Sequence, residues 1–264
     1  MFPIALILAV LVFITVGILI SAISILNIYH RHKKRRSPFT NKFLRGPGQS
    51  LIEKLDDIND ELFSYLAMMI AMPIMLYAFY ISDLYYKNRP LSLNLALVYI
   101  VAGVLIIGFL IFKMVRLLNL RRITRLGYEG EVATGQELNQ MMLQGYHVYH
   151  DFVADKFNID HIVVGPAGVY AVETKARSKP TSGNRSTDYK VTYDDKCIQF
   201  PNWKEFKPLE QARNQATWLE RWLSSATGEK TLVRPVVALP GWFTTRMSSN
   251  GIPVINPKRF TEIA

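Results

Sequence analysis

Three long runs of apolar residues in the first half of the chain constrain its fold more than any other feature. The first run, from Pro3 to Ile28, holds no charged residue. At about 1.5 Å per residue, a helix of this length exceeds the roughly 30 Å hydrocarbon core of a bilayer. The second and third runs, residues 63–82 and 91–112, also lack charged residues. Because no charge lies within the runs, they offer no support for a transport or proton-relay function.

These runs predict three transmembrane helices. We place the first within residues 1–30 and a transmembrane hairpin within residues 63–123, with its helices at 63–82 and 91–112. A cleaved signal peptide is disfavoured, because no basic segment precedes the first run and the run is too long.

Basic residues set the expected orientation in the membrane. Clusters follow the first and third runs: Arg31, Lys33, Lys34, Arg35 and Arg36, then Lys113, Arg116, Arg121, Arg122 and Arg125. Cytoplasmic loops carry such an excess of Lys and Arg. We therefore expect an integral protein of a bacterial inner membrane, with the N-terminus outside and the loop and C-terminal domain in the cytoplasm. A lipid bilayer is then one of its partners.

The cytoplasmic loop, residues 31–62, contains a helical pattern. Apolar residues recur at Leu51, Leu55, Ile58 and Leu62, which is the spacing of an amphipathic helix. We interpret it as a lead-in to the second span, with a partner-binding helix as the alternative.

The net charge of +10 does not by itself indicate nucleic-acid binding. Nearly all of the excess Lys and Arg lies within residues 1–125, where it reports membrane topology. Residues 126–264 are close to neutral, so a nucleic-acid contact there requires a local basic patch.

From residue 124 to residue 264 the chain has the composition of a soluble α/β domain. Its single cysteine, Cys197, excludes an internal disulfide and a cysteine-based zinc site. Hydrophobic periodicity and turn residues predict the following elements: a helix at 130–143, a strand at 146–153, a central hairpin at 158–175, a small hairpin at 189–200, a helix at 208–226, a strand at 231–239 and a helix beginning at 257.

The central hairpin turns at Gly165-Pro166-Ala167-Gly168, and its register decides which side chains meet. A two-residue loop places Asp160 opposite Glu173, with side chains about 5 Å apart. A three-residue loop with a bulge slips the pairing, so that Asp160 faces Thr174. Lys175 shares the face of Glu173, because strand side chains repeat every two residues. We favour the two-residue loop, since it brings the two carboxylates together.

Two carboxylates and a lysine at one end of an apolar hairpin have a chemical use. Carboxylate oxygens hold a hard divalent cation, and the ammonium group beside them acts in acid–base chemistry or stabilises charge. The alternative is that Asp160, Glu173 and Lys175 are solvated residues at strand ends.

The spacing of Asp160 and Glu173-Thr174-Lys175 resembles the D…(D/E)xK signature of restriction-endonuclease-like nucleases. A wider set of residues resembles the nuclease-related domain (NERD) family: the runs 127–131, 159–169 and 172–175. The resemblance covers residues 124–264. It implies a restriction-endonuclease-like core, a mixed sheet flanked by helices, attached here to three transmembrane helices.

The resemblance also implies roles for particular residues. Asp160 and Glu173 would hold Mg²⁺ or Mn²⁺, and Lys175 would lie beside the attacking water. Glu131 corresponds to an acidic residue of the first helix, although Glu129 could be mistaken for it, and either could simply favour the helix N-terminus. Gln211 resembles a helix glutamine that some related nucleases use near the site, but these relatives often have a tyrosine four residues later, where this chain has Gln215.

Arg177, Lys179 and Arg185 follow the hairpin in a polar loop and are candidate phosphate contacts. A solvated basic loop is the alternative reading of these three residues.

The resulting hypothesis is a membrane-anchored, Mg²⁺-dependent nuclease with its catalytic domain in the cytoplasm. Its expected partner is nucleic acid, with DNA as the expected substrate. One alternative is a non-catalytic nucleic-acid-binding or scaffold module of the same fold. Another is a membrane sensor for which the C-terminal domain is the output.

Overall fold

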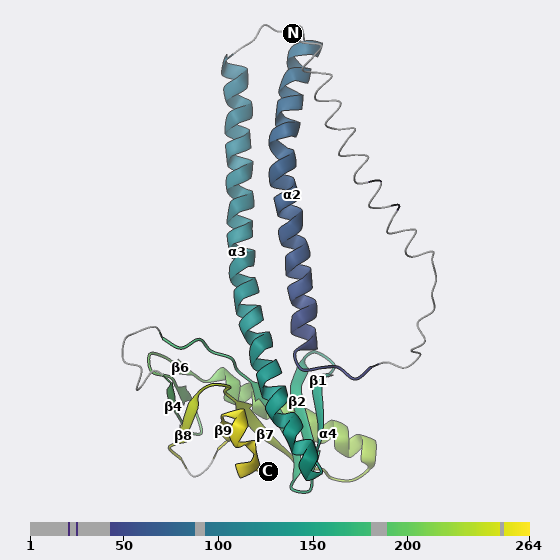
Figure 1. Ribbon diagram of the computed structural model, residues 1–264, viewed down its shortest axis with the longest axis vertical. Helices are drawn as coiled ribbons and strands as arrows, with labels where there is room; N and C mark the ends of the chain where they lie inside the picture. The colour runs from purple at the N-terminus through teal and green to yellow at the C-terminus, as the bar shows by residue number, and fades with distance from the viewer. Residues whose placement is uncertain (1–20, 22–24, 26–42, 88–92, 181–188, 249–250) are drawn as a thin grey trace. The chain divides into compact units, whose positions relative to one another are not determined.

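The computed structural model describes residues 21, 25, 43–87, 93–180, 189–248 and 251–264 (Figure 1). The predicted first span lies almost wholly outside the described residues, as does the loop residue Arg185. The chain divides into two compact units. The first comprises residues 1–42 and 58–119, and the second comprises residues 43–57 and 120–264.

Two long helices, α2 (Gln49–Tyr86) and α3 (Leu93–Asn139), dominate the described part of the first unit (Figure 1). Both are long and apolar enough to cross a membrane, so the described residues contain two of the three expected apolar helices. Within this unit the helices contact each other through small and aromatic residues. The rings of Tyr80 and Tyr99 meet edge to face at 5.7 Å, and Leu76 lies against Gly103.

The helix boundaries join elements that the sequence analysis gave separately. The amphipathic lead-in and the second span form one continuous helix, α2, and Pro73 within it does not end it. The helix expected at 130–143 is the last part of α3, followed by the short 3₁₀ helix η1 (Gln140–Gln144). Gly127 and Gly130 lie inside α3, and glycine in a helix interior costs only about 1 kcal/mol, so a long helix tolerates it.

A five-stranded mixed sheet forms the centre of the second unit, in the order β1-β2-β3-β7-β9. Neighbours β1–β2 and β2–β3 are antiparallel, whereas β3–β7 and β7–β9 are parallel. The strands are β1 (His147–Val153), β2 (Asn158–Gly165), β3 (Gly168–Thr174), β7 (Val233–Ala238) and β9 (Val254–Ile255).

The central hairpin has the two-residue turn. Gly165 pairs with Gly168, and His161 pairs with Val172. Continuing this register by one residue places Asp160 opposite Glu173, as the sequence analysis favoured. Gly168 has φ of +127°, a conformation that glycine adopts without strain.

A smaller sheet, in the order β6-β5-β4-β8, lies in the same unit. The expected hairpin at 189–200 is present as β4 (Lys190–Tyr193) paired with β5 (Ile198–Gln199). The sequence analysis missed three short strands, β6 (Lys204–Glu205), β8 (Phe243–Arg246) and β9. Strands of two to four residues are too short to show a periodic pattern.

Helix α4 (Lys207–Thr227) packs on one face of the large sheet through Ala216 and Leu219, which contact Ile162 and Ala171. The opposite face is covered by the end of α3, by η1 and by the 3₁₀ helix η2 (Pro257–Glu262), which replaces the helix expected from residue 257. The second unit is therefore an α/β domain with a mixed sheet flanked by helices.

Candidate active site

The expected site residues meet where β2 begins and β3 ends. Asp160 lies on β2, Glu173 lies near the end of β3, and Lys175 follows that strand directly. These residues line a pocket of about 600 Å³ together with Glu131 and Gln211. Further lining comes from α2, from α3, from the last residue of β3 and from the segment after that strand: Leu51, Ile123, Leu126, Gly127, Thr174, Ala176, Arg177 and Ser178. All of these residues belong to the second unit.

Asp160 is held by the backbone of the neighbouring strand. The Thr174 backbone N–H donates to Asp160 Oδ2 at 2.7 Å. Burial raises the pKa of the Asp160 carboxyl well above its usual range, and the charges of Glu173 and Glu131 raise it further. The hydrogen bond from Thr174 and the charge of Lys175 act in the opposite direction.

Glu173 is almost fully buried, at 1% exposure, and both of its carboxylate oxygens have partners. Lys175 forms an ion pair with Oε1, and Gln215 Nε2 donates to Oε2 at 2.5 Å. The Lys175 ammonium also donates to Gln211 Oε1 at 3.0 Å. Two glutamines of α4 thus bind the two charged side chains of this run: Gln215 binds Glu173, and Gln211 binds Lys175.

Glu131 approaches this pair from α3 and is 8% exposed. Burial raises its pKa to about 7, with repulsion from Asp151 and Glu173 contributing and Lys175 and the Gly48 backbone opposing. The neighbouring Gly130 explains the close approach of the helix, since a Cβ there would lie 2.5 Å from the Ala176 Cβ.

The alternative glutamate, Glu129, does not line the pocket. It is exposed and accepts a hydrogen bond at 2.9 Å from Arg125, one turn earlier on the same helix. Of the two glutamates that the sequence left open, the structure therefore brings Glu131 to the site.

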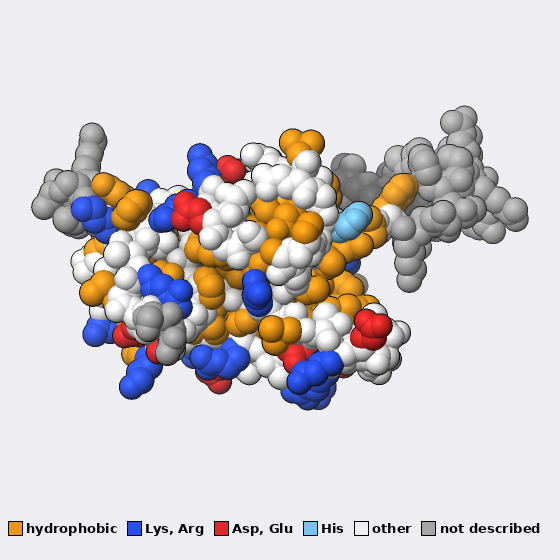
Figure 2. Space-filling view, turned by 90° about the horizontal axis from the view of Figure 1, so that it is seen from below, with side chains coloured by type: hydrophobic (Ala, Val, Ile, Leu, Met, Phe, Trp, Pro, Cys, Tyr) orange, Lys and Arg blue, Asp and Glu red, His pale blue; other side chains and the backbone are white. Residues whose placement is uncertain are grey.

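The basic candidates behave differently from one another. Arg177 lines the pocket, but its guanidinium is paired with both oxygens of Glu205, at 2.6 and 2.8 Å. The Lys179 ammonium lies 5.9 Å from the centre of the Trp242 ring and is not part of the pocket lining. Figure 2 shows Lys and Arg side chains dispersed among acidic and apolar ones on the face in view, not gathered in one patch.

Two residues of this region were not predicted as site residues. Gln215, whose place in related nucleases is taken by tyrosine, is 2% exposed and donates to both Glu173 and the Asn158 backbone oxygen. The helical spacing of Gln211 and Gln215 places both on the face of α4 toward the site. That spacing was the available signal, since two amides one turn apart can reach the same neighbouring strand.

The second unpredicted residue is Asp151 on β1, which is 1% exposed. Its carboxylate accepts from Arg45 Nε at 2.6 Å, from the Ser50 backbone and hydroxyl at 2.8 Å each, and from Asn158 at 3.0 Å. Its φ of +47° is uncommon for a residue other than glycine, although aspartate tolerates it. These bonds attach the segment 43–57 to the sheet, and Leu51 of that segment lines the pocket.

His161, next to Asp160 on the opposite face of β2, is buried and pairs with the half-buried His150. Their Nδ1 atoms lie 2.8 Å apart, and His150 Nε2 lies 3.0 Å from Asn139 Oδ1. Burial lowers the pKa of His161 to about 3, so both rings are neutral near pH 7. The pair packs α3 against the sheet and does not join the pocket.

Among the described residues, no group of three or more His, Cys, Asp or Glu side chains is arranged to hold a metal ion. The carboxylates of the pocket are nonetheless hard oxygen donors, and burial followed by repulsion among them raises the pKa of Asp160 and of Glu131. This chemistry fits a divalent cation. The Lys175 ammonium partly neutralises Glu173 in the structure.

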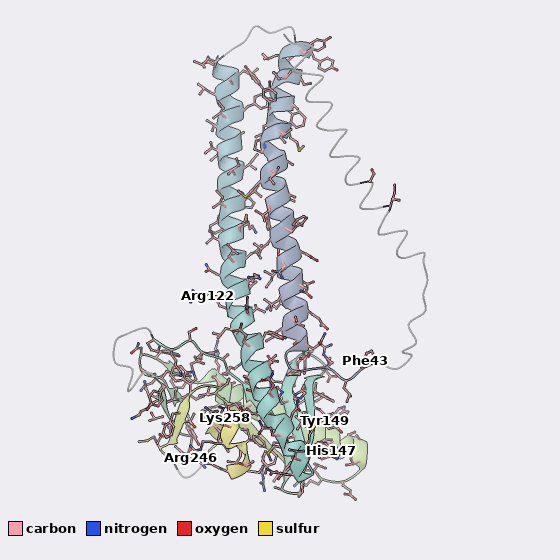
Figure 3. All side chains as sticks on the ribbon, in the orientation of Figure 1. Phe43, Arg122, His147, Tyr149, Arg246 and Lys258 are labelled. Atoms are coloured by element: carbon pink, nitrogen blue, oxygen red, sulfur yellow. The ribbon has the colours of Figure 1, made fainter. Side chains whose placement is uncertain are left out.

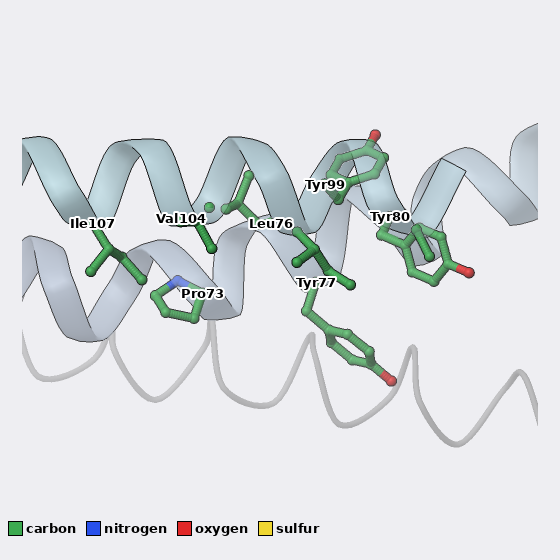
Figure 4. Close-up of a pocket in the computed structure, with 10 residues that line it drawn as sticks. Pro73, Leu76, Tyr77, Tyr80, Tyr99, Val104 and Ile107 are labelled. Carbon is green, nitrogen blue, oxygen red and sulfur yellow. The ribbon is translucent and has the colours of Figure 1, made fainter. Parts of the chain in front are cut away.

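A second pocket, of about 400 Å³, lies between α2 and α3 in the first unit (Figure 4). It is lined by apolar residues and by three tyrosines, Tyr77, Tyr80 and Tyr99. Its described lining contains no carboxylate, histidine or cysteine, so no reaction is assigned to it.

Comparison with known proteins bears on the second unit. Residues 126–240 match the model of a family described as the nuclease-related domain, NERD. No curated protein matches the chain, and no solved structure matches it. The matched range contains Asp160, Glu173, Lys175 and Glu131 but not Arg45 or Ser50.

Proposed function

Residues 126–240 form a nuclease-related domain, and on that premise we propose that this protein is a membrane-anchored, divalent-cation-dependent nuclease that hydrolyses phosphodiester bonds in DNA. Its core would be of the restriction-endonuclease-like type. The observation that carries the proposal is the convergence of Glu131, Asp160 and Glu173 with Lys175 on one pocket.

The electrostatics of the pocket support a site for a cation. Burial and mutual repulsion raise the pKa of Asp160 and of Glu131, so the deprotonated carboxylates are costly without a compensating charge. Asp160 and Glu173 would hold Mg²⁺ or Mn²⁺. A cation bound there supplies charge neutralisation at the phosphate and activation of water.

The protein's own groups would position the reactants. The Lys175 ammonium, held by Glu173 and Gln211, lies at the pocket and can orient a water or stabilise the phosphate charge. Gln215 donates to Glu173 Oε2, and this hydrogen bond holds the Glu173 carboxylate in place before a substrate binds. Arg177 could contact a phosphate after exchanging its partner Glu205.

Membrane anchoring rests on length and composition. The two described helices α2 and α3 can each span a bilayer, and basic residues cluster after the first and third apolar runs. We propose an inner-membrane protein with the N-terminus outside and the nuclease-related domain in the cytoplasm.

One observation favours a second candidate, a non-catalytic nucleic-acid-binding or scaffold module. Both oxygens of Glu173 are already engaged, one by an ammonium group and one by an amide. A site in which Lys175 permanently replaced the cation would bind nucleic acid without cutting it.

Metal-dependent nicking of supercoiled plasmid DNA by the full chain in detergent separates these candidates. We expect cleavage with Mg²⁺ or Mn²⁺, none with EDTA, and a loss on the order of 10²-fold in Lys175→Ala. Lys175→Ala should retain or slightly strengthen Mn²⁺ binding by calorimetry, because a protonated lysine has no lone pair for a metal. The exposed Lys258→Ala (Figure 3) is the matched control. Cleavage by Lys175→Ala at the wild-type rate would reject the assignment.

A further inference from the structure

A pocket of about 460 Å³ lies next to the candidate active site, and we refer to it as the Phe157 pocket. It is lined by Phe157, Lys207, Glu210, Gln211, Asn214 and Gln215. The five α4 residues recur at helical spacing and therefore occupy one stripe of that helix. Gln211 lines both pockets, so the Phe157 pocket adjoins the catalytic one.

An aromatic wall closes one side of the Phe157 pocket. Phe157, in the loop between β1 and β2, is 36% exposed. Its ring meets Trp218 edge to face at 5.6 Å, and Trp218 stacks on Trp222 at 6.3 Å. The ring of Phe157 thus packs against Trp218, which itself packs against Trp222, and it also lines the pocket. A supported, accessible ring of this kind is a platform for stacking a flat aromatic ligand.

Gln215 provides an independent sign of a ligand. Its Nε2 donates to Glu173 Oε2 and to the Asn158 backbone oxygen, which fixes the orientation of the amide. Its Oε1 is buried and has no hydrogen-bond partner among the described residues. A buried acceptor without a partner costs about 1–3 kcal/mol. A ligand in this pocket that carries an N–H group would remove that cost.

The remaining lining is polar and exposed. Within the described part of the chain, no hydrogen bond or ion pair engages the side chains of Lys207, Glu210 or Asn214. Asn214 can donate and accept, Glu210 can accept from an amine, and Lys207 offers a cation at the first turn of α4. A flat ring with amine and carbonyl edges, linked to a phosphate, matches this set.

We propose that the Phe157 pocket binds an unpaired nucleobase of the strand being cut, which makes single-stranded nucleic acid the preferred substrate class. This inference rests on the proposed function, because its ligand is part of the same substrate. The base stacks on Phe157, an N–H group of the base donates to Gln215 Oε1, and Lys207 contacts a flanking phosphate. A paired base is excluded, since its hydrogen-bonding edge and both faces are occupied in a duplex.

Binding can be measured without cleavage. A single-stranded oligonucleotide containing 2-aminopurine is titrated with the full chain in EDTA, and stacking is read as quenching of its fluorescence. Phe157→Ala should weaken single-strand binding about tenfold or more and abolish the quenching, while Phe157→Trp retains both. Tyr149→Ala, which alters an exposed aromatic of β1 outside this pocket (Figure 3), should bind as wild type.

A second measurement uses wild-type protein alone, so it does not depend on the folding of a variant. Unlabelled oligothymidine should compete about fivefold or more better than an oligonucleotide of N3-methylthymine, whose base carries no N–H donor. Equal competition would overturn the assignment of Gln215 Oε1 as the base acceptor. Unchanged quenching in Phe157→Ala, or equal loss of single-strand and duplex binding, would overturn the stacking subsite.

These outcomes separate the subsite from the nuclease. A protein that nicks plasmid with metal but whose Phe157→Ala variant binds normally keeps the proposed function and lacks the subsite. A protein that stacks 2-aminopurine and never cuts DNA keeps the subsite and lacks the proposed catalysis.

Discussion

Two acidic regions of the second unit lie close to each other in the chain and differ in how their charges are satisfied. Asp151 is buried and accepts four hydrogen bonds, one of them from an arginine. Glu173 and Glu131 are also buried and Asp160 is half-buried, but the three carboxyls share one lysine. Burial, and then repulsion within the cluster, raise the pKa of Asp160 and Glu131.

The difference separates a structural acid from candidate catalytic acids. A buried charge with a full set of donors stabilises the fold around it, because every lone pair that left water regains a partner. A cluster of mutually repelling carboxyls costs stability, and proteins retain such clusters where function requires them. The comparison predicts that neutralising Asp151 lowers the stability of the fold and largely spares cleavage. Neutralising a carboxylate of the pocket should abolish cleavage and largely spare stability.

The largest expected effect is on cleavage. Glu173→Gln keeps the shape of the side chain but removes the charge, so cleavage should fall by about 10³-fold or more. Thermal stability should change little, because the lost repulsion toward Asp160 and Glu131 offsets the lost ion pair with Lys175. The four tryptophans all lie between residues 203 and 242, so their fluorescence reports unfolding of the second unit. Glu229→Gln is the exposed control, and a large loss of stability without loss of cleavage would reverse the comparison.

The next effect is on stability. Asp151→Asn leaves Arg45 without its buried partner, and we expect a loss of about 3 kcal/mol in the free energy of unfolding. Cleavage, measured at a temperature where the variant is folded, should change by less than about tenfold. Asp155→Asn, an exposed carboxyl of the following loop, is the control. A catalytic collapse in Asp151→Asn with unchanged unfolding would place Asp151 among the catalytic acids.

The comparison also shows which features could be predicted from the sequence. The β2–β3 hairpin is local, and its Gly-Pro-Ala-Gly turn and alternating apolar residues specify the register that places Asp160 opposite Glu173. Helix α4 and the apolar parts of α2 and α3 follow from periodicity and length. These predictions depend on residues that are near one another in the chain.

The unpredicted features depend on distant residues. Asp151 is satisfied by Arg45 and Ser50, about a hundred residues earlier, and nothing in the local sequence marks that contact. In the sequence, Gln215 stands where related nucleases often have a tyrosine, so it did not suggest a site residue. Its hydrogen bond to Glu173 depends on how α4 packs on the sheet. The sequence analysis began a helix at Gly130, whereas α3 continues through this residue, and the close approach of Ala176 is what requires a small residue there.

The smallest expected effect concerns the pH dependence of stability at Glu131. Its pKa is about 7 in the folded protein, compared with an ordinary value of 4.5. The folded state therefore holds more protons than the unfolded state between these values, and the free energy of unfolding falls as pH rises from about 4.5 through about 7. The favourable contribution is fully present below pH 4.5 and is lost above pH 7.

Glu131→Gln removes this titration. In EDTA, the variant should be more stable than wild type at pH 8 by about 1–2 kcal/mol, with a flatter profile between pH 5 and pH 8. Asp160 retains part of the slope, because burial and the charge of Glu173 still raise its pKa. Glu129→Gln, two residues away and exposed, should follow the wild-type profile. If Glu131→Gln loses stability at pH 8, the carboxylate of Glu131 is satisfied as Asp151 is, and the site would contain two repelling acids, not three.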